Sequence, residues 1–120
     1  MIVGIGLDIV EIERIQKLTK RQPKFVFRIL TEKELTSLDK LPEKKQMEYI
    51  AGRFAAKEAC SKAIGCGIGA SLSFQDIEVL RSESGKPLLE VKKQAYKNKS
   101  YHVSITHTSG HAAAQVIIEE

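Results

Sequence analysis

The chain has 120 residues, 42% of them hydrophobic and 28% charged, with a formal net charge of +4. This composition is typical of one ordinary globular domain and excludes a disordered or fibrous protein. Cys60 and Cys66 lack the spacing of a zinc site and are too few for a disulfide framework, so we expect two reduced thiols. The positive charge favours an acidic partner, whether a nucleic acid, a phosphorylated ligand or an acidic protein.

The first residues, MIVGIGLDIVEIER, contain neither the basic region nor the cleavage site of a signal peptide. Acidic residues follow too soon for a membrane span. The chain contains no internal repeat and no long low-complexity segment. We therefore expect a cytoplasmic protein with a single domain, residues 1–120, and no membrane partner.

The N-terminal residues 2–7 form a β-branched, aliphatic run, which predicts a short strand. Gly4 and Gly6 would let another backbone or a ligand approach one side of this strand closely. Asp8 ends the predicted strand, and strand alternation places its carboxylate on the glycine-lined side. Asp8 is then either a ligand at a site or the N-cap of the following helix, and spacing alone favours the N-cap.

A basic, amphipathic stretch follows, and residues 9 to about 22 are predicted to form a helix that ends before Pro23. The segment from Arg14 to Arg28 carries six cationic residues and no acid, interleaved with Phe25 and Phe27. One interpretation is a solvated basic face, and the other is a surface that docks a partner. We expect both phenylalanines to be exposed, which favours docking.

Two further helices are predicted in the middle of the chain. Residues 31–41 begin with a capping-box pattern formed by Thr31 and Glu34. The next helix begins near Glu43, contains strong helix formers and no proline, and closes at Gly65, which suits a helix C-cap.

Glu58 and Lys62 of this long helix fall within the arc formed by its apolar residues. Charged side chains on a buried arc need partners, because their desolvation is costly. One interpretation is an i,i+4 ion pair on the surface, which spacing alone favours. The other is a site in which Glu58 holds a cation and Lys62 holds an anion, such as a metal and a phosphate.

The C-terminal part changes to a strand-forming pattern. The predicted elements are strands at 77–80, 88–91, 101–106 and 112–118, and a brief helix at 92–98. The first two strands form a hairpin across the turn RSESGKP. The fold class is therefore α+β, with an N-terminal strand and helices packed on a mostly antiparallel C-terminal sheet. His107 stands where a strand runs into its turn, a position where a lone histidine is more often structural than a ligand.

Three separated segments together resemble one family. They are GIGLDIVEIERI at 4–15, RFAAKEACSKAIG at 53–65 and SITHT at 104–108. In this order they closely resemble the 4'-phosphopantetheinyl transferases, specifically the short holo-acyl carrier protein synthase type. The resemblance covers nearly the whole chain.

The resemblance implies an activity. Such enzymes transfer the phosphopantetheine arm of coenzyme A to a serine of apo acyl carrier protein, in support of fatty acid biosynthesis. They release adenosine 3',5'-bisphosphate, require Mg²⁺, and form homotrimers with active sites at the subunit interfaces. We expect the same reaction, cofactor and assembly here.

The resemblance also implies roles for individual residues. Asp8 and Glu58 match the metal ligands, and Lys62 matches the lysine on the phosphates, so these three are the candidate catalytic residues. The general base stays open between Glu58 and a water that works with Glu58 or Asp8. Mg²⁺ prefers one or two carboxylates together with water and substrate phosphates, so two protein ligands suffice.

Two groups of binding residues follow from the same match. The candidate coenzyme A contacts are Lys62, Gly65, Ser84, Gly85, Lys86, Pro87, Thr106, His107 and Thr108. The candidate carrier-protein contacts are Arg14, Arg21, Lys24, Phe25 and Arg28. The SGKP turn and the SITHT strand match segments that a neighbouring subunit contributes to the nucleotide pocket. Thr106 stands where the family often has serine, and both side chains carry a hydroxyl group.

Two rival functions are weaker. A small nucleic-acid-binding module is supported only by the net charge and the basic segment, and it leaves Asp8 and Glu58 unexplained. A catalytically silent trimeric scaffold would not need Asp8, Glu58 and Lys62 together. We therefore expect an enzyme without a nucleic-acid partner.

Overall fold

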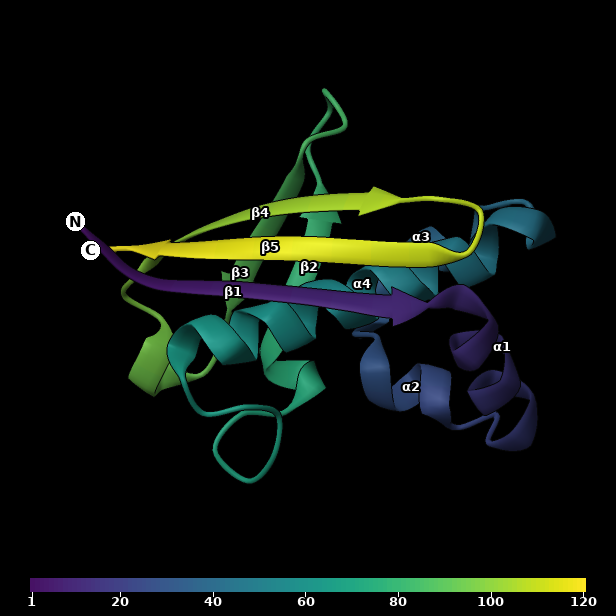
Figure 1. Ribbon diagram of the computed structural model, residues 1–120, viewed down its shortest axis with the longest axis horizontal. Coiled ribbons are helices and arrows are strands. Elements are labelled where there is room, and N and C mark those ends of the chain that lie inside the picture. Colours follow the sequence, from purple (N-terminus) through teal and green to yellow (C-terminus); the bar gives the residue numbers. More distant parts are fainter.

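A three-stranded antiparallel sheet forms one layer of the molecule (Figure 1). The computed structural model describes every residue of the chain. The sheet has the order β1-β5-β4 and is built from β1 (Ile2–Glu11), β4 (Ser100–His107) and β5 (His111–Glu119). A separate antiparallel hairpin consists of β2 (Ile77–Arg81) and β3 (Pro87–Val91), and β3 lies next to β4. The α+β prediction is confirmed.

Helices cover one face of this sheet. They are α1 (Ile12–Arg21), α2 (Phe25–Ile29), α3 (Glu32–Asp39), α4 (Glu43–Ile64) and the single 3₁₀ turns η1 (Phe74–Asp76) and η2 (Gln94–Tyr96). The long helix α4 packs against β1 and β5 on one side and against α2 and β2 on the other. None of the helices combines the length and the apolar character that a membrane span needs.

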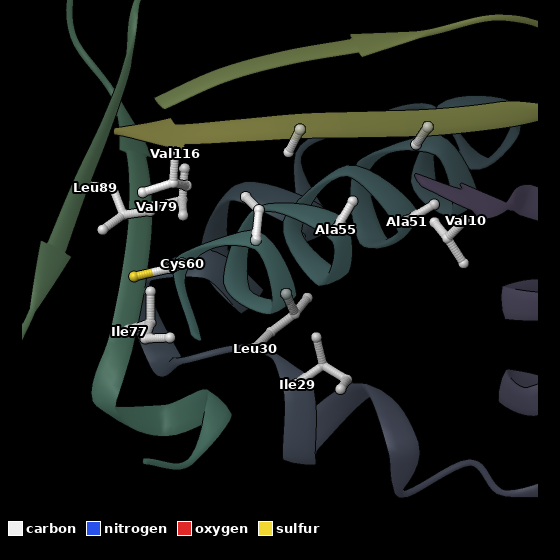
Figure 2. Close-up of a cluster of buried hydrophobic side chains, with 14 of the residues drawn as sticks. Val10, Ile29, Leu30, Ala51, Ala55, Cys60, Ile77, Val79, Leu89 and Val116 are labelled. Carbon is white, nitrogen blue, oxygen red and sulfur yellow. The ribbon is translucent and has the colours of Figure 1, made fainter. Parts of the chain in front are cut away.

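The predicted long helix is confirmed from Glu43 to its C-cap at Gly65, which has the left-handed φ of 96°. Its buried surface is wider than the predicted arc, because structure lies on both sides of it. Small side chains such as Ala51 and Ala55 face the sheet, and Cys60 lies beside Val79 of the hairpin (Figure 2). This central helix is the scaffold on which the rest of the domain packs.

Two glycines let β1 lie directly on α4. A Cβ atom at Gly6 would overlap the carbonyl oxygen of Ala59, and one at Gly4 would overlap that of Ala63. The predicted close approach is therefore confirmed, and the partner is the backbone of α4. Any larger residue at Gly6 would push the strand away from the helix.

The predicted end of the first strand is wrong. β1 continues past Asp8 to Glu11, because β5 pairs with it as far as the Glu11–His111 pair. Asp8 is therefore not an N-cap, since α1 begins at Ile12 after Glu11, which provides no side-chain cap. Asp8 is held within the strand, and its side chain lies on the glycine-lined side that faces α4.

The remaining local predictions were partly right. The capping box of Thr31 and Glu34 is present at the start of α3. The brief helix expected at 92–98 is shorter, a single 3₁₀ turn at η2. The five-residue helix α2 was not predicted, because it is too short to carry a helical pattern of its own.

Candidate active site

Asp8 and Lys62 meet where β1 crosses the last turns of α4. Lys62 Nζ donates a hydrogen bond to Asp8 Oδ1 at 2.9 Å and to the carbonyl oxygen of Leu7 at 3.2 Å. The Asp8 side chain is 16% exposed and the Lys62 side chain 53%. The hydrogen bond and the charge of Asp8 raise the pKa of Lys62. Lys62 pairs with Asp8 across elements, so the interpretation as an i,i+4 pair with Glu58 is wrong.

Glu58 lies one turn before Lys62 and is only partly exposed. Burial raises the pKa of Glu58, and the neighbouring charge of Asp8 raises it further, while Lys62 and Arg14 lower it. The net shift is upward, so the ionised form of Glu58 is disfavoured at this position. The two carboxylates are therefore near neighbours, and the charge of Lys62 does not fully compensate their repulsion and burial.

This cluster suits a divalent cation. Carboxylate oxygens are the ligands that Mg²⁺ prefers, and a cation between Asp8 and Glu58 would remove their mutual repulsion. Lys62 adds a mobile, half-exposed ammonium group at the rim, where an anion could reach it. The donor set fits a metal together with a phosphate.

A pocket lies at the other edge of the sheet, apart from the Asp8 cluster. It is a pocket of about 850 Å³ between α3, α4, the hairpin and the end of β4. Its lining includes the predicted residues Gly85, Pro87, Thr106 and His107, and four cationic residues, Lys33, Lys45, Arg53 and Arg81. A pocket with this charge suits a phosphorylated ligand.

Several predicted residues lie outside the lining of this pocket. Ser84 and Lys86 belong to the same turn as Gly85, and Thr108 follows His107. Gly65 lies three residues after Lys62, at the end of α4. Within one chain the predicted coenzyme A contacts thus divide between two places.

Several polar residues of the pocket were missed by the sequence analysis, and Arg53 and Glu48 make specific contacts there. Arg53 is 4% exposed, its guanidinium carbon lies 4.2 Å from the ring centroid of Tyr49, and its Nε has no hydrogen-bond partner. Burial lowers the pKa of Arg53. Glu48 Oε1 lies 2.9 Å from His107 Nε2 and holds that ring at the pocket wall. Arg53 could have been noticed as a further charge among the small residues of α4.

The two sites lie at opposite edges of the sheet. Asp8 is on the edge strand β1, His107 is on the edge strand β4, and β5 lies between them. The pocket lining shares no residue with the Asp8, Glu58 and Lys62 cluster. The structure therefore does not bring all predicted site residues together within one chain.

The predicted carrier-protein contacts of the basic segment are exposed, with one exception. Arg14, Arg21, Lys24 and Arg28 are exposed. Phe25 is only 8% exposed and packs against Phe54, with ring centroids 6.1 Å apart, so the expectation that it is exposed was wrong. The reason is helical geometry, because Phe27 lies about 200° further round the same turn and is 64% exposed.

Comparison with known proteins identifies the family of this chain. The model of the 4'-phosphopantetheinyl transferase superfamily matches residues 4–116. The chain belongs to this family and is an enzyme of the phosphopantetheinyl transferase class.

Its relatives are similar over their whole length. A holo-[acyl-carrier-protein] synthase of Bacillus pumilus is 56% identical over 119 residues, covering 99% of this chain and 97% of that protein. The crystal structure of a Bacillus anthracis holo-(acyl-carrier-protein) synthase in complex with CoA (3',5'-ADP) superposes with a TM-score of 0.90 at 48% identity, covering 100% of this chain and 98% of that one. A Helicobacter pylori holo-[acyl-carrier-protein] synthase in complex with coenzyme A gives a TM-score of 0.85 at 43% identity, with 96% and 99% coverage.

Proposed function

We propose that this enzyme transfers 4'-phosphopantetheine from coenzyme A to a serine of an apo acyl carrier protein. The observation that carries the proposal is the cluster of Asp8, Glu58 and Lys62. It offers two carboxylates for a metal and one ammonium group for a phosphate. The Bacillus pumilus relative, and the two relatives whose crystals contain coenzyme A or its nucleotide part, support this substrate pair.

In the proposed reaction, the serine hydroxyl oxygen attacks the phosphorus that carries the pantetheine arm. A new phosphorus–oxygen bond forms to serine, and the bond to the oxygen of the adjoining phosphate breaks. Adenosine 3',5'-bisphosphate leaves with the electron pair of that bond. The serine proton passes to Glu58, or to a water that works with Glu58 or Asp8.

The protein side chains position and neutralise the charged groups. Asp8 and Glu58 would hold Mg²⁺, which supplies charge neutralisation on the phosphate oxygens. Lys62 would leave part of its contact with Asp8 and donate to the same phosphate oxygens. The nucleophile belongs to the carrier protein, so this chain needs no nucleophilic residue of its own.

The two separated sites favour a homotrimer with interfacial active sites. The basic pocket near His107 would receive the nucleotide end of coenzyme A, and the Asp8 cluster of a neighbouring copy would hold the reacting phosphates. The outer face of β1 supports the assembly, because Ile5, Leu7 and Ile9 are 60%, 64% and 66% exposed. A row of exposed aliphatic side chains is typical of an interface.

The exposed basic segment would dock the carrier protein. Arg14 also acts electrostatically on Glu58, so this surface lies beside the Asp8 cluster, where the serine must arrive. An acidic partner would be steered toward it, and the attraction would weaken with salt. We further propose a cytoplasmic role in fatty acid biosynthesis.

Intact-mass analysis of an apo carrier protein tests the reaction. The carrier is incubated with the enzyme, coenzyme A and Mg²⁺, and with Glu58→Gln enzyme as a control. We expect a mass increase of one phosphopantetheine group with the wild-type enzyme and almost none with the variant. An unchanged carrier mass, together with salt-dependent nucleic-acid binding unaffected by coenzyme A, would support the nucleic-acid-binding alternative.

A further inference from the structure

The short helix α2 is held at its C-terminal end by side chains from other elements. The last four carbonyl groups of a helix have no partner within it. In α2 the carbonyl of Val26 accepts from the backbone N–H of Leu30. The other three belong to Phe27, Arg28 and Ile29, and all three accept from side chains.

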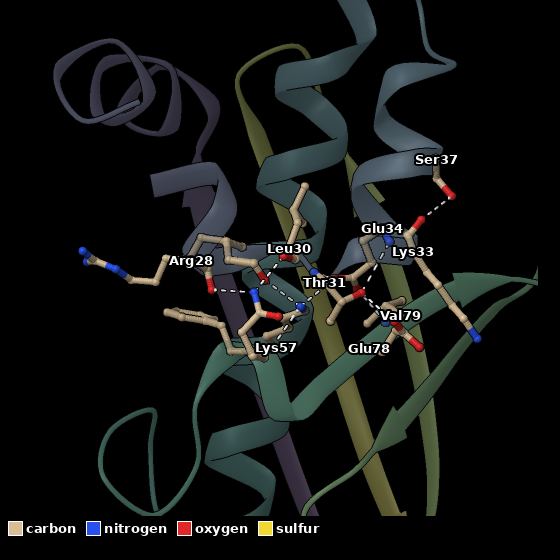
Figure 3. Close-up of polar contacts among 12 residues, drawn as sticks. Arg28, Leu30, Thr31, Lys33, Glu34, Ser37, Lys57, Glu78 and Val79 are labelled. Carbon is tan, nitrogen blue, oxygen red and sulfur yellow. Dashed lines mark hydrogen bonds and ion pairs between the residues drawn. The ribbon is translucent and has the colours of Figure 1, made fainter. Parts of the chain in front are cut away.

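Gln75 of η1 provides most of this cap. Its Nε2 lies 2.9 Å from the carbonyl oxygen of Phe27, 2.7 Å from that of Leu30 and 3.3 Å from that of Arg28. An amide nitrogen has two N–H groups, so the longest contact is a shared one. Figure 3 shows Arg28 with its carbonyl in a hydrogen bond and its side chain directed away from the cluster. Gln75 thus holds the backbone from which Phe27 and Arg28 project.

Gln75 itself is anchored to the catalytic helix. The carbonyl of the preceding residue, Phe74, accepts from Lys57 Nζ at 3.1 Å, and Lys57 also donates to the carbonyl of Ile29 at 2.6 Å. The ring of Phe74 stacks on Phe54 of α4, with centroids 5.6 Å apart. Lys57 is the residue next to Glu58. A chain of direct contacts therefore runs from α4 through η1 to the exposed surface of α2.

We propose that Gln75 is a positioning residue for carrier-protein recognition, because it fixes the surface formed by Phe27 and Arg28 relative to α4. A five-residue helix is unstable on its own, so its presentation depends on these caps. This inference rests on the proposed docking role of the basic segment. It adds Gln75, a residue outside that segment, which acts through the backbone of α2.

The test compares two glutamines with the same local role. Gln75→Met removes the N–H donors without changing charge or much volume. Gln46→Met is the matched control, because Gln46 Nε2 donates in the same way to the carbonyls of Leu38 and Leu41 at the end of α3.

Steady-state kinetics with apo carrier protein and with coenzyme A are measured for both variants. We expect Gln75→Met to raise the KM for carrier about three- to tenfold, as the loss of one or two hydrogen bonds predicts. The kcat and the KM for coenzyme A stay unchanged, and Gln46→Met leaves the KM for carrier unchanged.

Hydrogen exchange gives an independent reading. In Gln75→Met the amides of residues 25–30 should exchange faster, while those of α4 remain protected. Unchanged exchange in residues 25–30 would overturn the proposal. A lowered kcat together with equal increases in the KM for carrier and the KM for coenzyme A would also overturn the proposal, because that pattern indicates general destabilisation.

Phe27→Ala separates this inference from the function on which it rests. If Gln75 acts through Phe27, the double variant loses less than the product of the two single effects. A raised KM for carrier in Phe27→Ala without one in Gln75→Met overturns the role of Gln75 and leaves the docking surface standing. A normal KM for carrier in Phe27→Ala and in Arg28→Ala removes the docking role of Phe27 and Arg28 and the inference with it. Absence of any transfer by the wild-type enzyme contradicts the proposed function itself.

Discussion

Lys57 and Glu58 are neighbours on α4, yet they belong to two charge clusters of opposite character. Lys57 and Glu34 are 0% exposed and 2.7 Å apart, and Figure 3 shows them surrounded by further polar partners. Glu34 also accepts from the backbone N–H groups of Thr31 and Val79. In contrast, Glu58 lies beside Asp8 at the surface, and the only lysine nearby pairs with Asp8.

One helix thus carries a residue for stability and a residue for chemistry side by side. Burial lowers the pKa of Lys57 although the charge of Glu34 opposes that shift, so even this completely bonded pair offsets only part of the desolvation of the lysine. Glu58 is left undercompensated, and its raised pKa means that its charge opposes folding at neutral pH. We expect substitutions in the first cluster to reduce stability, and substitutions in the second to reduce activity.

The largest effect is expected in the buried cluster. Lys57→Met leaves the Glu34 carboxylate buried without its cation, and we expect a loss of about 3–5 kcal/mol in the free energy of unfolding. Urea denaturation followed by circular dichroism measures it. Lys62→Met is the control, because its side chain is half-exposed and we expect little change. Equal stability of the two variants would contradict the comparison.

The next prediction concerns substitutions in the Asp8, Glu58 and Lys62 cluster, which should reduce activity and not stability. Glu58→Gln and Asp8→Asn should each lower the transfer rate about 10²–10³-fold, the usual cost of removing one preorganised charge-stabilising group. Glu58→Gln should unfold at the same urea concentration as wild type or a higher one, because an unfavourable charge is removed. The initial rate of carrier modification is measured at saturating Mg²⁺. Near-normal turnover by Glu58→Gln would exclude the metal-holding role.

The basic surface beside the exposed cluster gives a smaller effect. Reversing Arg14 and Arg21 to Glu should raise the KM for carrier about tenfold at low salt, because electrostatic steering is lost. The difference from wild type should shrink at 1 M salt, where the Debye length falls to about 3 Å. Steady-state kinetics across a salt series measure the KM for carrier. Lys97→Glu, a charge reversal at an exposed residue that follows η2, is the control. Wild-type efficiency of the reversed variant at low salt would mean that the surface is only solvated.

The smallest effect concerns pH and the edge of the buried cluster. Burial opposes ionisation of Glu78, but hydrogen bonds from Thr31 and Lys92 outweigh it and lower its pKa. A lowered carboxyl pKa contributes stability above its unfolded value, about 4.3, and this contribution is lost as pH falls through the folded value. Glu78→Gln should therefore cost about 1–2 kcal/mol at pH 7 and progressively less below pH ~4. Urea denaturation at several pH values checks this, and a cost that does not change with pH would contradict it.

The elements with strong local signals could be predicted from the sequence. The long helix, the capping box of α3 and the hairpin follow from spacing, capping residues and turn residues. The Asp8, Glu58 and Lys62 cluster was also predicted, because two charges on an apolar helical arc need partners. The resemblance to a family added Asp8 to this pair.

Features set by tertiary contacts could not be predicted. α2 exists because Gln75 and Lys57, both distant in sequence, cap its carbonyls. The strand β1 extends beyond Asp8 because β5 pairs with it. Lys57 was overlooked in favour of Glu58, although it is the fully buried charge, because only the fold places Glu34 beside it.

We propose that the Asp8, Glu58 and Lys62 cluster of one copy and the His107 pocket of another form one active site. Glu58→Gln and His107→Ala enzymes, each of which we expect to be weakly active alone, are unfolded together at equal concentration, refolded and assayed by the carrier's intact mass. In a cyclic assembly with sites between neighbours, about one interface in four then joins two intact halves. We expect the mixture to recover about a quarter of the wild-type rate. A mixture no more active than the average of the two variants, in particles shown to contain both subunits, would contradict it.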